Sequence, residues 1–174
     1  MPKRNNTILA IDPGLKDLGF AVIVGRRLIT SGVIPLRLVI KDGRMREARR
    51  RIAALASSHR PGTIVFEKTY RHPLPWLDAL HGITRSVRRL AYRRGLAFEM
   101  YSPQAVRSTV AGNGRARKPE VAIAIAHRFP QLRVYLTQDR RWKERFWLNM
   151  IDAVALALHH QALGKPPSRS RSSG

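Results

Sequence analysis

The 174-residue sequence contains no cysteine, and it contains only 11 Asp and Glu residues against 33 Lys and Arg. The lack of cysteine excludes disulfides, thiolate zinc sites and a cysteine nucleophile. No apolar run approaches the roughly 18 residues of a membrane-spanning helix, and the basic N-terminus lacks the apolar stretch of a signal peptide. We therefore expect a cytoplasmic protein with no membrane partner.

The charge that is present is strongly positive, with a formal net charge of +22 and a sequence pI of about 11.8. Basic proteins bind nucleic acid because neutralised phosphates release their counterions, so a polyanion is the expected partner. Hydrophobic residues make up 44% of the chain, which is normal for a packed globular domain. Composition alone does not separate an enzyme from a basic structural protein that binds RNA.

The pattern of apolar residues predicts an α/β fold. Apolar runs predict strands at 7–11, 18–24, 28–36, 63–66 and 96–101, and helical spacing predicts helices at 44–60, 75–94, 103–111, 119–129 and 144–163. The first three strands form an antiparallel meander because their spacers are short, and the later strands, which alternate with helices, add parallel neighbours. We expect a mixed five-stranded sheet with helices on both faces, in a single domain over 1–163. Residues 164–174 read as a disordered basic Ser/Pro/Arg tail.

Two features of the predicted helices suggest contacts. Apolar residues recur at spacings of four and three along the helix at 75–94, as regularly as in a coiled-coil seam, at Trp76, Leu80, Ile83, Val87 and Leu90. Such a stripe predicts a contact with another helix or with another subunit. The last helix ends in His159 and His160, which we expect to complement the helix dipole.

Three of the few acidic residues stand at notable positions. Asp12 follows the first strand, Glu67 follows the fourth, and Asp152 lies in a helix that is apolar nearly all round. Taken singly, they could be a turn, a solvent-facing strand end and a helix cap. If the two strands are parallel neighbours, however, Asp12 and Glu67 leave the sheet at one edge, and a helix packed across that edge brings Asp152 alongside.

Three converging carboxylates repel one another unless a cation lies between them, and oxygen ligands favour Mg²⁺ or Mn²⁺. On such a basic protein, this cluster indicates metal-assisted hydrolysis of phosphodiesters. A Gly-Asn-Gly sequence at 112–114 is followed by Arg115, Arg117 and Lys118. It is interpreted either as an ordinary hinge between helices or as a flexible basic arm that contacts phosphate.

Four motifs together resemble the RuvC-type Holliday junction resolvases. They are Ile11-Asp12-Pro13-Gly14 with Gly19 after it, Phe66-Glu67, Gly112-Asn113-Gly114 with Lys118 after it, and Asp152-Ala153-Val154-Ala155-Leu156-Ala157. The similarity runs from about residue 8 to 160 in the order and near the spacing of the family. The resemblance implies a ribonuclease H-like fold and a crossover junction endodeoxyribonuclease that nicks two symmetric strands as a homodimer. It also implies a branched DNA substrate, one or two Mg²⁺ or Mn²⁺ ions per subunit, and a branch-migration motor as a further partner.

The resemblance assigns roles by position. It makes Asp12, Glu67 and Asp152 metal ligands and Lys118 a catalytic cation near the scissile phosphate. Arg107 falls where the family places a basic residue, and Tyr70 falls where the family places an aromatic that inserts at the crossover. The stripe from Trp76 to Leu90 becomes a candidate for part of the subunit interface.

One position departs from the family pattern. The family usually has a fourth ligand, a carboxylate or a histidine, three residues before the last aspartate, and this chain has Asn149. Asn149 can offer a carbonyl oxygen to a metal but no charge. A natural variant, a one-metal or inactive homologue, and a deliberate Asp-to-Asn change all remain open. The alternatives to a resolvase are a catalytically weak or inactive junction-binding homologue and another ribonuclease H-like nuclease.

Overall fold

The computed structural model describes residues 6–14, 16–36, 41–69, 75–136 and 141–164, without the side chains of 41–42, 75–77 and 141–146. The predictions made for Tyr70 and for the tail after residue 164 lie outside the described residues. Within the part that is described, no helix is long and apolar enough to cross a membrane.

The structure confirms the predicted mixed sheet. The elements in chain order are β1 (Thr7–Pro13), β2 (Asp17–Val24), β3 (Arg27–Pro35), α1 (Lys41–His59), β4 (Thr63–Glu67), α2 (Pro75–Arg93), β5 (Ala97–Tyr101), α3 (Pro103–Ala111), α4 (Lys118–Arg128), the 3₁₀ helix η1 (Pro130–Tyr135) and α5 (Arg141–Ala162). The strand order is β3-β2-β1-β4-β5. The meander β1-β2-β3 is antiparallel, whereas β4 runs parallel to both β1 and β5. The 3₁₀ helix η1, which begins at Pro130, was not predicted from the sequence.

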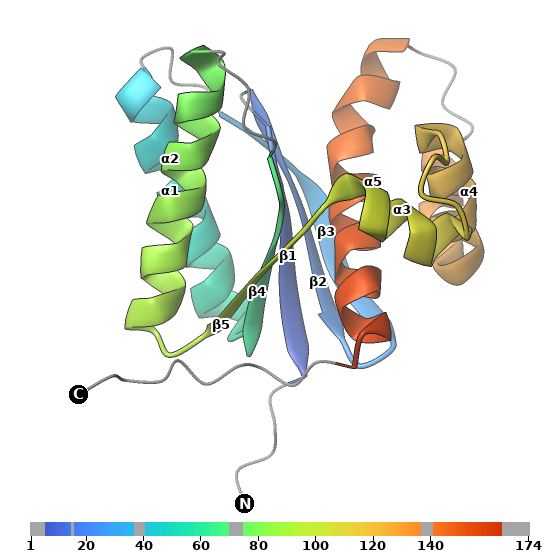
Figure 1. Ribbon diagram of the computed structural model, residues 1–174, viewed down its shortest axis with the longest axis horizontal. Coiled ribbons are helices and arrows are strands. Elements are labelled where there is room, and N and C mark those ends of the chain that lie inside the picture. Colours follow the sequence, from blue (N-terminus) through green and yellow to red (C-terminus); the bar gives the residue numbers. More distant parts are fainter. Residues whose placement is uncertain (1–5, 15, 37–40, 70–74, 137–140, 165–174) are drawn as a thin grey trace, which may run out of the picture.

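Helices cover both faces of the sheet, as predicted (Figure 1). Helices α1 and α2 lie on one face, and α5 lies on the other with α3 and α4 outside it. Because side chains alternate along a strand, β1 divides its apolar residues between two cores. Leu9 and Ile11 pack with α1 and α2, whereas Ile8 and Ala10 pack with α5.

The apolar stripe of α2 is buried inside the chain. Leu80, Ile83 and Val87 are at most 5% exposed, and they share a core with Ile52 of α1 and Phe66 of β4. The predicted contact between helices is therefore confirmed. The use of the stripe as a subunit interface is wrong at these three positions, because the sheet and α1 already cover them.

The two histidines near the end of α5 are also buried rather than placed at an exposed helix end. His159 and His160 are 5% and 4% exposed. The hydroxyl of Tyr101 in β5 lies 2.8 Å from His160 Nδ1, and the hydroxyl of Thr109 in α3 lies 2.7 Å from His159 Nδ1. Both histidines lie in the last turn of α5, as predicted, but β5 and α3 cover them and supply polar partners, so their effect on the helix dipole stays a prediction.

Candidate active site

The alternation of side chains along the strands brings Asp12 and Glu67 to one place. Ile11 of β1 pairs with Phe66 of β4 in parallel register, so the next residues of both strands are neighbours at the carboxyl edge of the sheet. Asp12 follows Ile8 and Ala10 on the face that packs against α5, and Glu67 follows Val65 on the same face. Both carboxylates therefore lie on the side of the sheet that α5 covers, as the sequence predicted.

A glycine lets α5 approach this edge closely. Gly19 of β2 is the antiparallel partner of Asp12. A Cβ atom added to Gly19 would lie 1.8 Å from the backbone oxygen of Asn149 in α5. Any side chain at position 19 would push the helix outward. This contact fixes the depth of α5 and sets Asp152, about one turn beyond Asn149, over the edge of the sheet.

The electrostatics show that the three carboxylates influence one another. Burial raises the pKa of Asp12 well above its usual value, and the negative charges of Glu67 and Asp152 raise it further. Burial, followed by the charge of Asp152, raises the pKa of Glu67 to about 7. Carboxylates shifted in this direction are destabilised as anions, so they gain from a nearby cation.

Two basic side chains supply part of that positive charge. Lys118, the first residue of α4, places its Nζ 2.8 Å from Oδ2 of Asp152. Burial lowers the pKa of Lys118, but the three carboxylates together raise it above its usual value, with Asp152 contributing most. Lys118 and, less strongly, Arg107 of α3 hold the pKa of Glu67 below the value that burial and Asp152 would otherwise give.

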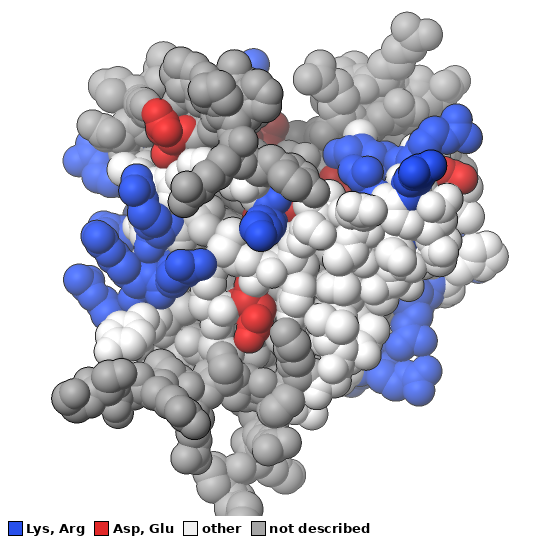
Figure 2. All heavy atoms as spheres, in the orientation of Figure 1, with Lys and Arg blue, Asp and Glu red and all other residues white. Residues whose placement is uncertain are grey.

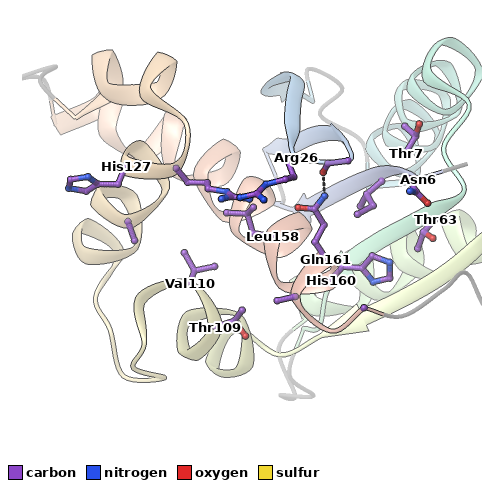
Figure 3. Close-up of a pocket in the computed structure, with 16 residues that line it drawn as sticks. Asn6, Thr7, Arg26, Thr63, Thr109, Val110, His127, Leu158, His160 and Gln161 are labelled. Carbon is purple, nitrogen blue, oxygen red and sulfur yellow. Dashed lines mark hydrogen bonds between the residues drawn. The ribbon is translucent and has the colours of Figure 1, made fainter.

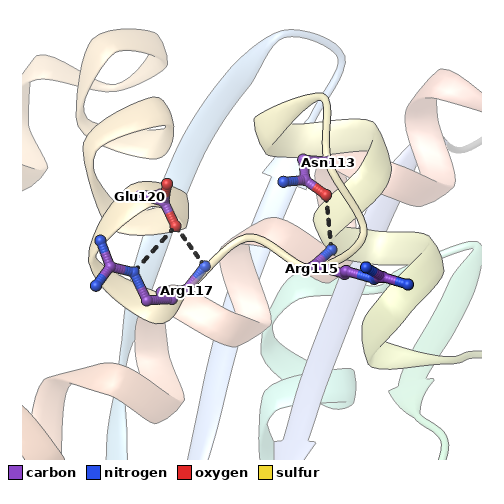
Figure 4. Close-up of polar contacts among 4 residues, drawn as sticks. All are labelled: Asn113, Arg115, Arg117 and Glu120. Carbon is purple, nitrogen blue, oxygen red and sulfur yellow. Dashed lines mark hydrogen bonds and ion pairs between the residues drawn. The ribbon is translucent and has the colours of Figure 1, made fainter.

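The loop that carries the other basic residues was predicted to be either an ordinary hinge or a flexible basic arm, and in the structure it is a turn with internal hydrogen bonds (Figure 4). Gly112 ends α3 with a φ of 72°, in the left-handed region that favours glycine. Asn113 Oδ1 accepts a hydrogen bond from the backbone nitrogen of Arg115 at 2.9 Å. The side chain of Glu120 accepts from the backbone nitrogen of Arg117 and pairs with its guanidinium at 3.6 Å. Both arginine side chains remain exposed.

Asn149 lies against the connection between β1 and β2. Its Nδ2 is 3.5 Å from the backbone oxygen of Asp17, and it is also close to Gly14. The amide is half-buried, on the same helix as Asp152 and three residues before it. The structure thus places Asn149 beside the strand end that carries Asp12, and the amide nitrogen faces the loop.

The oxygen atoms of Asp12, Glu67, Asp152 and Asn149 are of the kind that hard divalent cations prefer, although the side chains are not arranged as a complete metal site. Among the described side chains, no three His, Cys, Asp or Glu residues stand together in an arrangement ready to hold a metal ion. The expectation of three carboxylates within one metal's reach is therefore not met by the described side chains, and the roles of Asp12, Glu67 and Asp152 as metal ligands stay a prediction. The ammonium group of Lys118 donates a hydrogen bond to Oδ2 of Asp152. Burial, together with neighbouring negative charge, raises the pKa of Asp12 and Glu67, and a hard cation such as Mg²⁺ or Mn²⁺ would stabilise these oxygen donors as anions.

A pocket of about 970 Å³ lies at the opposite edge of the sheet (Figure 3). Its walls include Thr7 and Thr63 at the beginnings of β1 and β4, Arg26 of the turn after β2, and Gln161 near the end of α5. Gln161 donates to the backbone oxygen of Gly25 across this pocket. None of the residues that line it is Asp or Glu, so the pocket is separate from the carboxylate cluster.

Comparison with known proteins identifies the family of this chain. A family model described as crossover junction endodeoxyribonuclease RuvC matches residues 8–160. The chain is 30% identical over 159 residues to the crossover junction endodeoxyribonuclease RuvC of Azorhizobium caulinodans, covering 88% of each chain. It is 34% identical over 131 residues to the protein of the same name from Rhodopirellula baltica, covering 71% of this chain and 74% of that one.

Solved structures show the same fold. The chain is similar to T. thermophilus RuvC in complex with a Holliday junction substrate, with a TM-score of 0.74, 22% identity and coverage of 91% of this chain and 94% of that one. It is also similar to the yeast mitochondrial Holliday junction resolvase Ydc2, with a TM-score of 0.66, 18% identity and coverage of 89% and 77%. These neighbours confirm the ribonuclease H-like architecture. The family match, over most of its length, shows that this chain belongs to the RuvC family of crossover junction endodeoxyribonucleases.

Proposed function

We propose that the chain is an Mg²⁺- or Mn²⁺-dependent endonuclease that resolves four-way DNA junctions. The observation that supports this proposal most is that Asp12 and Glu67 end neighbouring parallel strands at one edge of the sheet. Lys118 contacts Asp152 on the helix that packs over this edge. A protein with a net charge of +22 holds its mutually repelling carboxylates at this edge. The binding of DNA by the related T. thermophilus protein supports the choice of substrate.

The three carboxylates would hold one or two metal ions, with the carbonyl oxygen of Asn149 as a neutral fourth ligand. A bound ion would activate the attacking water and neutralise the leaving oxygen of the phosphodiester. The buried position of Asp12 and the half-buried position of Glu67 limit the water around them, which strengthens their interaction with a cation.

The chain's own cations act on the phosphate. Lys118 is 45% exposed while its Nζ contacts Asp152, so it can exchange this partner for a phosphate oxygen as the substrate arrives. It would then stabilise the negative charge that develops in the transition state. Arg107 would favour the ionised form of Glu67 by lowering its pKa, and the exposed guanidinium groups of Arg115 and Arg117 would position the strand through phosphate contacts.

The symmetric product requires two active sites, and we propose that a homodimer supplies them. Each subunit would nick one of two equivalent strands, with Tyr70 at the crossover. A cytoplasmic location and a branch-migration motor as a further partner belong to the same proposal. A junction-binding protein without cleavage activity is the second candidate, because Asn149 gives the site one negative charge fewer than a carboxylate at that position would.

Charge-removing substitutions test the site. Purified Asp12→Asn, Glu67→Gln and Asp152→Asn variants should each lose at least about 100-fold in the rate of junction cleavage with Mg²⁺ or Mn²⁺. Each substitution removes the negative charge of a proposed metal ligand, and the metal would stabilise the charge that develops on the phosphate in the transition state. Glu99→Gln is the matched control, since it removes an acid from the middle of β5 outside the cluster. It should cleave at the wild-type rate.

Binding to the same junction without added metal separates the two candidates. The three variants should bind at least as tightly as the wild type, because each removes a negative charge facing DNA. A wild-type protein that binds the junction but leaves every strand intact with both metals would make the junction-binding candidate correct. Equal cleavage by the three variants and the control would place the chemistry elsewhere.

A further inference from the structure

Six arginines line a groove between α1 and α2, on the layer that covers the opposite face of the sheet from α5. The groove has a volume of about 840 Å³, and its arginines are Arg46, Arg49 and Arg50 of α1 and Arg85, Arg89 and Arg93 of α2. Figure 2 shows basic side chains gathered on the left of the molecule, over these two helices. None of the residues that line the groove is acidic.

The two helices hold these arginines in facing rows. Arg85, Arg89 and Arg93 are four residues apart, so they share one face of α2. A Cβ atom on Gly82 would lie 2.6 Å from Sδ of Met45, so the helices touch there and the rows face each other along the groove. Ala53 and Leu90 add apolar lining between them.

The six arginines differ from three other arginines on these helices or directly after them, Arg51, Arg88 and Arg94, which contact groups within the chain. Arg51 pairs with Glu47 at 3.8 Å. Arg88 donates to Sδ of Met100 and lies over the ring of Phe98. Arg94 donates to Ser57 and to the backbone of Ala53. Among the described side chains, no carboxylate forms an ion pair with any arginine of the groove. Like charges gathered in one groove repel one another, and a bound polyanion relieves that repulsion.

We propose that this groove binds the phosphate backbone of a duplex arm of the DNA substrate, as a second contact surface distinct from the carboxylate edge. The proposal rests on the proposed function for the identity of its ligand. Arginine suits phosphate because its planar guanidinium donates two parallel hydrogen bonds. Arg85 to Arg93 spans about 12 Å of helix axis, which corresponds to three or four phosphate steps of about 3.4 Å along a duplex. A second copy of this chain is a poor occupant, because two such faces would oppose arginine to arginine.

Salt-dependent binding of junction DNA without metal tests the groove. The double variant Arg85→Gln/Arg89→Gln is compared with Arg27→Gln/Arg133→Gln, which loses the same charge from exposed positions outside the groove. The probes are fluorescent four-way junctions with arms of about 25 and about 6 base pairs, which extend about 85 Å and about 20 Å from the crossover. On the long arms, the groove variant should lose roughly tenfold in affinity at physiological salt, and its salt slope should fall by about 2 in magnitude. On the short arms, both double variants should differ little from each other.

Three outcomes would overturn the proposal. Equal losses by the groove variant and its control would reduce the effect to net charge. An unchanged affinity of the groove variant would show that DNA does not contact the groove. A changed sedimentation coefficient of the groove variant, with DNA affinity intact, would make this face a protein contact. Failure of the proposed function would look different, because junction cleavage by the wild type would be absent whatever the binding to long arms.

Discussion

The balance of charge around Glu67 decides how the site behaves as pH changes. Burial and Asp152 raise the pKa of Glu67 to about 7, against a usual value of 4.5, while Lys118 and Arg107 act in the opposite direction. At this edge of the sheet, burial and Asp152 therefore favour the protonated form of Glu67, whereas Lys118 and Arg107 favour its ionised form. A divalent ion would tip this balance toward the ionised form.

The raised pKa of Glu67 predicts a pH dependence of stability. The folded protein holds the Glu67 proton more tightly than the unfolded chain does, so the stabilising contribution is complete below about pH 4.5 and is lost as pH rises to about 7. Urea unfolding in EDTA should show a free energy of unfolding that declines across this window. Glu67→Gln, which cannot ionise, should make the decline less steep while the raised pKa of Asp12 still contributes to it, and Glu99→Gln should leave the full decline in place. A decline that is equally steep in Glu67→Gln would show that another group causes it.

If Asn149 is a neutral metal ligand, it should bind Mg²⁺ weakly, and substitutions at this position should change the Mg²⁺ concentration that cleavage requires. Asn149→Asp adds a negative charge three residues before Asp152, and the affinity of oxygen sites for divalent cations increases with ligand charge. We expect the Mg²⁺ concentration for half-maximal cleavage to fall by about tenfold, which corresponds to about 1.4 kcal/mol. Asn149→Ala, which removes the carbonyl oxygen, should raise it. If Asn149→Asp and Asn149→Ala change the metal requirement in the same direction, Asn149 acts through packing and not as a ligand.

At the scale of elements, the sequence is most informative where strand periodicity controls position. Two apolar strands that end in Asp12 and Glu67 were sufficient to predict that parallel pairing would bring these acids to one edge. The approach of α5 to Gly19 was not predictable, because it depends on the distance between a helix and a strand that are distant in sequence. The α2 stripe was correctly predicted to contact a helix, but its further assignment to a subunit interface was wrong at Leu80, Ile83 and Val87 for a related reason. An apolar stripe is the same whether the sheet or another subunit covers it, and only packing identifies the sheet.

The close contact at Gly19 predicts a coupled loss of stability and activity. In Gly19→Ala, the added methyl group would overlap the backbone of α5, so we expect unfolding to cost about 3 kcal/mol less. Because the displaced helix carries Asp152, cleavage should fall too. Gly32→Ala is the control, since its Cβ would meet only the side chain of Phe20, at 3.1 Å, and should cost less than about 1 kcal/mol. Equilibrium urea unfolding measures both, and equal stability of the two variants would contradict the close packing of α5 on β2.

At the scale of the whole molecule, the net charge of +22 and the small acidic cluster have different consequences. The positive surface favours binding to any DNA at low salt, because counterion release does not depend on the shape of the substrate. Tight binding alone therefore does not distinguish a junction resolvase from a general basic protein. We propose that the carboxylate edge cleaves the strand, whereas the basic turn before α4 and the arginine groove bind phosphate. Only the first of these proposals concerns strand cleavage.

The central claim is selective cleavage, and mapping of strand breaks on matched substrates tests it most directly. The wild-type protein is incubated with a synthetic four-way junction and with linear duplexes of the same sequence, in Mg²⁺ or Mn²⁺ at physiological salt, and every strand is labelled in turn. We predict paired nicks at symmetric positions in two opposite strands of the junction, little cleavage of the duplexes, and loss of both nicks in Asp12→Asn. Cleavage of linear duplex at the rate of the junction, or nicks that persist in Asp12→Asn, would contradict this account.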